Sequence, residues 1–156
     1  MASQTLAVSN PELDADRVRR HTAPYVNEQI DRLTRASIAE HRAAGSEAVQ
    51  RRLTELDHEW DVDRALMVNF AIAGGVSFAL GLTRYAQTPL LGPRRKGFLY
   101  FFGAQLTFLL VHGVVGWCPP AVVFRRLGFR TQREIEVERA GLRELSAGRE
   151  ATTATA

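Results

Sequence analysis

Two long apolar stretches interrupt a sequence that is otherwise rich in charge. No Asp, Glu, Lys or Arg occurs in residues 65–83, nor in residues 97–124. A helix rises ~1.5 Å per residue, so about 20 residues cross the ~30 Å hydrocarbon layer of a bilayer. We therefore expect two membrane-spanning helices, at about 65–83 and 97–118, joined by a basic connection in which Pro89 and Pro93 make the chain turn.

The region before the first apolar stretch has helical periodicity. A first helix is expected to follow Thr22 as N-cap, with Pro24 in its opening turn, and to end at Gly45; a second is expected after Ser46 as cap. Each carries an apolar stripe: Val26, Ile30, Leu33 and Ser37 on the first, and Val49, Leu53, Leu56 and Trp60 on the second. Such a stripe can pack on the other helix, on the headgroup layer or on another protein. The apolar side chains of this arm, residues 22–60, make a small core, which favours packing on the membrane helices or on a partner.

A third amphipathic helix is expected after the second span. Thr131 and Glu134 have the spacing of a capping box, which predicts a helix over 131–145 carrying Ile135, Leu142 and Leu145. Residues 1–21 are expected to form a flexible lead, and residues 146–156 a disordered tail. The predicted fold is all-α: a two-helix transmembrane hairpin over 61–126 with amphipathic helical arms at both ends.

The distribution of charge adds expectations about partners and orientation to this predicted fold. Residues 1–64 hold 9 basic and 12 acidic side chains, and residues 65–156 hold 11 and 5. Arginines beside apolar segments suit anionic headgroups, and no nucleic-acid-binding motif accompanies them, so we expect lipid and not nucleic acid as partner. The flanks carry more basic residues than the connection, and the first ten residues lack a cleavable signal. Both features favour a multi-pass protein of the bacterial inner membrane with cytoplasmic termini.

Small residues recur along the first span at intervals of four. Such strips let another helix backbone approach closely, which is how membrane helices associate. The strips can serve packing on the second span or on a second copy of the chain, and they consist of Ala71, Gly75 and Ala79 on one side and of Ala73, Ser77 and Gly81 on the other.

Polar side chains within the spans are candidates for function. A histidine at membrane depth normally faces the bundle interior, and His112 can carry a proton or bind a metal. No second His, Asp or Glu lies in either apolar window, so we expect a neutral His112 that is hydrogen-bonded to Asn69, Gln105 or a backbone carbonyl. Anchoring at the membrane surface is expected from Trp117, Tyr100, Arg125 and Arg126.

Cys118 is the one cysteine of the chain, so no intramolecular disulfide is possible. The nearby arginines favour a thiolate and hence persulfide, metal or oxidant chemistry. The expected position at a helix C-terminus disfavours a thiolate. A functional thiol and a small packing residue both remain open.

The motif around Cys118 resembles a known family. Asp63-Arg64 opens the first span, and the second ends in Gly116-Trp117-Cys118-Pro119, followed by Leu127-Gly128 and Thr131. Over residues 61–131 this pattern resembles the YgaP-like inner-membrane transmembrane domain family, in which such a hairpin occurs alone or fused to a rhodanese sulfurtransferase domain. The chain departs from it by Pro120, a longer stretch over 121–126 and the two arms. The resemblance implies the topology and a link to sulfur or persulfide handling, without implying catalysis.

Two functions from different classes fit these patterns. The first is a non-enzymatic accessory or adaptor subunit that packs on a partner membrane complex through hairpin and arms. The second is a homo-oligomeric carrier or pore for a sulfur species, proton or ion that uses Cys118 or His112. No paired carboxylates, nucleophile with its base or phosphate-binding loop is recognisable, so we expect neither an enzyme nor a bound cofactor or metal, and we prefer the adaptor.

Overall fold

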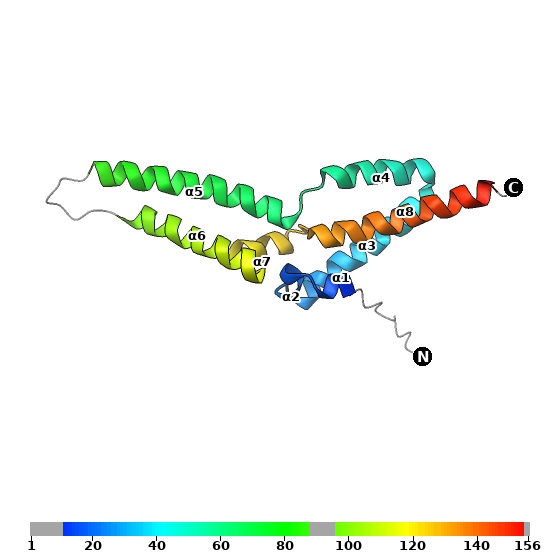
Figure 1. The fold of residues 1–156 in the computed structure, drawn as a ribbon, viewed down its shortest axis with the longest axis horizontal. Coiled ribbons are helices and arrows are strands. Elements are labelled where there is room, and N and C mark those ends of the chain that lie inside the picture. Colours follow the sequence, from blue (N-terminus) through cyan, green and yellow to red (C-terminus); the bar gives the residue numbers. More distant parts are fainter. Residues whose placement is uncertain (1–10, 88–95, 155–156) are drawn as a thin grey trace. The chain divides into compact units, whose positions relative to one another are not determined.

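A computed structural model of the chain describes residues 11–87 and 96–154, and these residues form helices without strands (Figure 1). The all-α prediction is therefore confirmed. Pro89 and Pro93 of the predicted connection lie outside the described residues. The helices are α1 (Pro11–Asp14), α2 (Arg17–Arg20), α3 (Pro24–Ala44), α4 (Ser46–His58), α5 (Val62–Ala86), α6 (Gly97–Val115), α7 (Pro119–Arg126) and α8 (Gln132–Ala154).

The chain divides into two compact units. The bundle unit consists of the residues up to Glu59 and those from Arg130 onward, and the apolar unit is Trp60–Phe129. Two helical stretches, Ser46–Ala86, which includes α5, and Gly97–Val115, which is α6, are long and apolar enough to cross a membrane.

The bundle unit has its own hydrophobic core. Helices α3, α4 and α8 pack on one another (Figure 1), and buried Val49 and Leu56 of α4 meet Ile135 and Leu142 of α8, which are 1% and 0% exposed. The stripe of α4 thus finds its partner in the helix that follows the second apolar stretch. We expected the arm to pack on the membrane helices or on another protein because its own core is small. Packing on α8 already explains why α4 carries an apolar stripe.

The first described residues are more ordered than the predicted flexible lead. Asp16 accepts hydrogen bonds from the backbone amides of Val18 and Arg19 and so caps α2. Val18 is buried, and the Arg19 guanidinium reaches Asp31 of α3 and Glu134 of α8. These contacts explain why residues 17–20 form a helix although their sequence is polar.

The predicted helix ends and stripes of the arm need small corrections. Ala23, not Thr22, is the N-cap of α3, with Pro24 at its first position. The N-cap of α4 is Gly45, not Ser46. The backbone φ at this position is 103°, a value that glycine adopts readily and other residues rarely do.

The apolar stripes are also corrected. Leu33 is exposed, and Thr34 continues the buried row of α3 in its place. Trp60 lies beyond the end of α4 and is 44% exposed.

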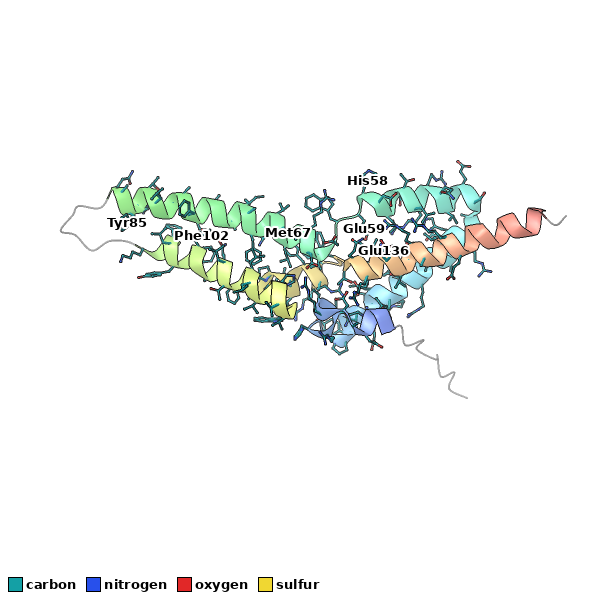
Figure 2. All side chains as sticks on the ribbon, in the orientation of Figure 1. His58, Glu59, Met67, Tyr85, Phe102 and Glu136 are labelled. Carbon is teal, nitrogen blue, oxygen red and sulfur yellow. The ribbon has the colours of Figure 1, made fainter. Side chains whose placement is uncertain are left out.

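In the apolar unit, α5 and α6 lie side by side (Figure 1). A Cβ atom on Gly81 would lie 2.6 Å from Cδ2 of Leu99, and Phe102 of α6 is packed 3.4 Å from the corresponding position at Gly74 (Figure 2). The Ser77 hydroxyl donates to the Gln105 amide oxygen at 3.2 Å. In one predicted strip, Ser77 and Gly81 thus face α6, and Ala73 is half-buried. The residues of the other strip are exposed: Ala71, Gly75 and Ala79.

The end of α6 differs from the prediction. The helix stops at Val115 and not near residue 118, because Gly116 adopts the left-handed conformation at its C-cap. The chain then enters α7, a short helix that the sequence patterns did not predict and that packs on α5.

The last helix is longer than predicted. Its capping box is confirmed: the Thr131 amide donates to the Glu134 carboxylate at 2.8 Å, and the Glu134 amide donates to Thr131 Oγ1 at 3.3 Å. Helix α8 continues to Ala154. Residues 146–154, which were predicted to be disordered, are therefore helical. Alanine, glutamate and arginine in this segment are strong helix formers.

Candidate functional site

Three side chains with complementary chemistry meet in the apolar unit. His112 Nε2 lies 2.7 Å from Oδ1 of Asp63, and the Cys118 thiol is close enough to the same ring to interact with it. The His112 side chain is 5% exposed and that of Asp63 is 37% exposed. Nδ1 of His112 makes no hydrogen bond of normal geometry to any described residue. We call Asp63, His112 and Cys118 the thiol cluster.

The backbone explains why these residues meet. Asp61 caps α5 by accepting a 2.7 Å hydrogen bond from the Arg64 amide, and this places Asp63 in the first turn. His112 lies in the last turn of α6. Neighbouring helices that run in opposite directions bring a first and a last turn together, and the turn at Gly116 leads the chain back to Cys118.

The predicted partners of His112 are wrong. The histidine pairs with Asp63 and not with Asn69 or a backbone carbonyl, while Gln105 bonds to Ser77. Sequence reasoning missed this pair because Asp63 lies two residues outside the charge-free window. Antiparallel packing of the two expected helices places the start of the first beside the end of the second. This consideration was sufficient to predict the pair of Asp63 and His112.

The helix position of Cys118 is also corrected. It is the N-cap residue of α7, with extended backbone, rather than the C-terminus of α6. A helix N-terminus favours negative charge, although Pro119 and Pro120 contribute no N–H groups there. The thiol is 0% exposed, so a reagent reaches it only after a local opening of the unit.

This arrangement has a defined chemical capability. A carboxylate that accepts from an imidazole fixes the orientation of the ring, and the oriented ring can take a proton from a neighbouring thiol. Among the described residues, no group of three or more His, Cys, Asp or Glu side chains is arranged to hold a metal ion. The thiol cluster is therefore a candidate for proton-coupled thiol chemistry.

A second ionisable cluster lies in the bundle unit. Glu138 of α8 is fully buried and accepts from Arg52 at 2.8 Å, from Ser37 at 2.6 Å and from Arg130. Arg130 in turn binds both carboxylate oxygens of Glu59 at 2.7 Å. Burial by itself raises the pKa of Glu138, but the hydrogen bonds from Arg52, Ser37 and Arg130 outweigh it and lower the pKa to about 2. Such a fully paired carboxylate holds helices together and leaves no site for a ligand.

The expected membrane anchors lie in different environments. Tyr100 and Trp117 are 70% and 40% exposed, and Arg126 is exposed. Arg125 is 2% exposed and donates to the Phe129 carbonyl at 3.0 Å. It therefore joins the end of α7 to the following turn instead of reaching a surface.

Comparisons with protein-family models, with curated proteins and with solved structures gave no match to this chain.

Proposed function

We propose that this is a two-span protein of the bacterial inner membrane, with a hairpin of α5 and α6 and cytoplasmic termini, that carries a sulfur species on Cys118. One observation supports the sulfur chemistry above the alternatives. The two residues that the sequence offers for it, Cys118 and His112, lie together, and Asp63 binds Nε2 of the same ring. The resemblance of the Gly116-Trp117-Cys118-Pro119 motif to the YgaP-like family suggests sulfane sulfur as the cargo.

The proposed step is the transfer of one sulfur atom. The Cys118 sulfur attacks the outer sulfur of a donor persulfide, the donor S–S bond breaks, and a new S–S bond forms on Cys118. His112 takes the thiol proton and returns it to the departing donor thiolate, while Asp63 keeps the ring oriented. A persulfide and a thiol are exchanged for a thiol and a persulfide, so no oxidant or reductant is consumed.

Sulfur loading of the purified chain tests this function. The full chain in lipid nanodiscs is treated with a small-molecule persulfide, and intact-protein mass spectrometry follows the gain of one sulfur atom with time. We expect loading of the wild-type protein and none of Cys118→Ser. His112→Ala should slow loading by about 100-fold, the usual contribution of a positioned base, and Asp63→Asn should slow it less.

Two controls keep the result interpretable. Circular dichroism must show that the His112→Ala and Asp63→Asn chains keep their helix content, and alkylation in denaturant must show that Cys118 is reduced in each. Ser77→Ala serves as a matched variant, because Ser77 is a buried polar residue of the same unit that lies outside the thiol cluster. Loading at the wild-type rate in His112→Ala would contradict the proposed role of the cluster.

An accessory subunit is the second candidate function, and a different observation favours it. In the exposed strip of Ala71, Gly75 and Ala79, the first two residues line a groove of about 290 Å³ whose lining also includes Phe102 and Gln105. A strip of small residues beside a polar amide is typical of surfaces where membrane helices associate.

Purification in mild detergent distinguishes the two functions. Mass photometry and mass spectrometry of the retained proteins should reveal stoichiometric partners if the chain is an accessory subunit. Gly75→Leu should then release the partner, whereas Gly103→Leu, at an exposed glycine of α6, should retain it. Recovery of an isolated monomer would count against the accessory function and leave the sulfur carrier untouched.

A further inference from the structure

Both tryptophans of the chain belong to one end of the apolar unit. Trp60 immediately precedes the N-cap of α5, and Trp117 follows the C-cap of α6. The bond between Asp63 and His112 shows that the start of α5 and the end of α6 lie together. The two indole side chains are 44% and 40% exposed, so this end presents both of them outward.

Arginines accompany the two tryptophans. The Arg64 guanidinium lies 4.7 Å from the centre of the Trp60 ring and is exposed, and Arg126 is exposed in the last turn of α7. The carboxylates nearby are engaged within the unit, because Asp61 caps the helix and Asp63 binds His112. Arg64 and Arg126 therefore place two exposed positive charges beside the tryptophans, while the two carboxylates keep their negative charge and are hydrogen-bonded within the unit.

Helix α7 adds an apolar face to the same end. Ala121 and Arg125 are buried in the unit, whereas Val123 and Leu127 are 56% and 69% exposed. A short helix with apolar side chains open on one side and an arginine next to them is typical of helices that lie in the plane of a membrane interface.

We propose that this end of the apolar unit binds anionic phospholipid headgroups, with α7 lying in the interface. We call the surface the tryptophan–arginine end, and it consists of Trp60, Arg64, Trp117, Val123, Arg126 and Leu127. The proposal rests on the membrane insertion of α5 and α6 that forms part of the proposed function.

A lipid surface fits this end better than a protein does. The surface continues directly into the exposed apolar sides of the two helices, at Met67 on α5 and Val114 on α6. Tryptophan concentrates at the headgroup level of bilayers. The guanidinium fork matches the phosphate of a headgroup, and each arginine near an anionic surface gains about 1 kcal/mol, or about fivefold in lipid preference.

Tryptophan fluorescence measures this directly, because Trp60 and Trp117 are the two tryptophans of the full chain. The protein is reconstituted in phosphatidylcholine membranes containing phosphatidylglycerol, and bromine is placed on the acyl chains of one lipid at a time. We expect brominated phosphatidylglycerol to quench at least about twice as strongly as brominated phosphatidylcholine at equal mole fraction, since the arginines enrich it locally. Trp60→Phe and Trp117→Phe assign the signal to each position.

Charge variants identify the cause. Arg64→Gln with Arg126→Gln should reduce the two quenching efficiencies to the same value. Arg84→Gln, in the last turn of α5, should leave the preference intact. A preference that survives the double variant would overturn the proposal, as would equal quenching of the wild-type protein by both lipids. Absence of quenching by either lipid would instead overturn membrane insertion itself, and a protein partner would then be sought at this end.

Discussion

The bundle unit and the apolar unit differ in which side chains they bury. In the bundle unit the apolar residues Leu56 and Leu142 lie inside, and even the buried carboxylate of Glu138 is matched by arginines. In the apolar unit large apolar side chains such as Ile72 and Leu110 point outward, while Ser77 and Gly81 lie between the helices. The difference is expected if the solvent around α5 and α6 is lipid, because burial of apolar surface then brings no gain and close backbone packing replaces it.

This contrast also places chemistry differently in the two units. Ion pairs of the bundle unit connect α2, α3, α4 and α8, and the central carboxylate of Glu138 accepts from three side chains. The thiol cluster of the apolar unit is small and leaves a ring nitrogen without a hydrogen bond among the described residues. The bundle unit therefore offers stability, and the apolar unit offers the groups that can react.

The largest effect should come from removing the centre of the ion-pair network. Glu138→Ala leaves Arg130 and Arg52 without their shared carboxylate, and breaking a buried pair costs about 3–5 kcal/mol. We expect faster hydrogen–deuterium exchange throughout α8 and α4 and little change in α5 and α6. Equal acceleration in both units would show that they do not differ in the way described.

Acid should act on the same carboxylate in the wild-type protein. Because the pKa of Glu138 is lowered from 4.5 to about 2, its contribution to stability is complete above the unfolded value and is lost as the pH falls from about 4.5 to about 2. Circular dichroism in an acid titration should therefore show loss of helix in this range. Glu138→Gln should remove part of the pH dependence, while Glu136→Gln, at a more exposed position of α8, should retain it.

Two glycines of α5 test the packing rule of the apolar unit. Gly81→Ala places a methyl group against Leu99, and such overpacking costs about 1–3 kcal/mol. Gly75→Ala meets nothing within 4 Å and should change stability by less than about 1 kcal/mol. Thermal unfolding in detergent compares the two, and an equal loss in both would contradict the assignment of the helix face.

The smallest effect is expected at the cap of α8. Thr131→Ala removes the acceptor for the Glu134 amide and should destabilise the bundle unit by about 1 kcal/mol. Thr131→Ser keeps the hydroxyl and should restore most of the loss in the same hydrogen-exchange assay. The effect should be confined to the first turns of α8.

Local patterns in the sequence predicted most of the fold. The charge-free windows located α5 and α6 because a helix that is apolar on all sides needs a long stretch of sequence without charge. The cap of α8 was readable because its two residues, Thr131 and Glu134, are three positions apart. Helix α7 was missed because its apolar residues continue the preceding window and only the turn at Gly116 separates them.

Local sequence patterns did not predict the contacts between residues that are distant in sequence. Ser37 and Glu138 are 101 positions apart, and the meeting of α8 with α3 and α4 depends on side chains whose partners no periodicity reveals. The candidate residues Cys118 and His112 were recognised by type, but their connection to Asp63 required the two helices to be aligned. Polar partners just outside an apolar window therefore belong in the search for intramembrane sites.

The order in which the bundle unit is assembled follows from its division along the chain. Helices α3 and α4 are synthesised before the apolar unit, and α8 is synthesised after it. Val49 and Leu56 of the newly made α4 lack their partners on α8 until the apolar unit has left the ribosome, which favours protection by a chaperone during synthesis. For the proposed membrane hairpin, closure of the bundle also requires the two ends of the chain to lie in the same compartment, so a chain in which one helix alone had crossed the membrane could not complete its fold.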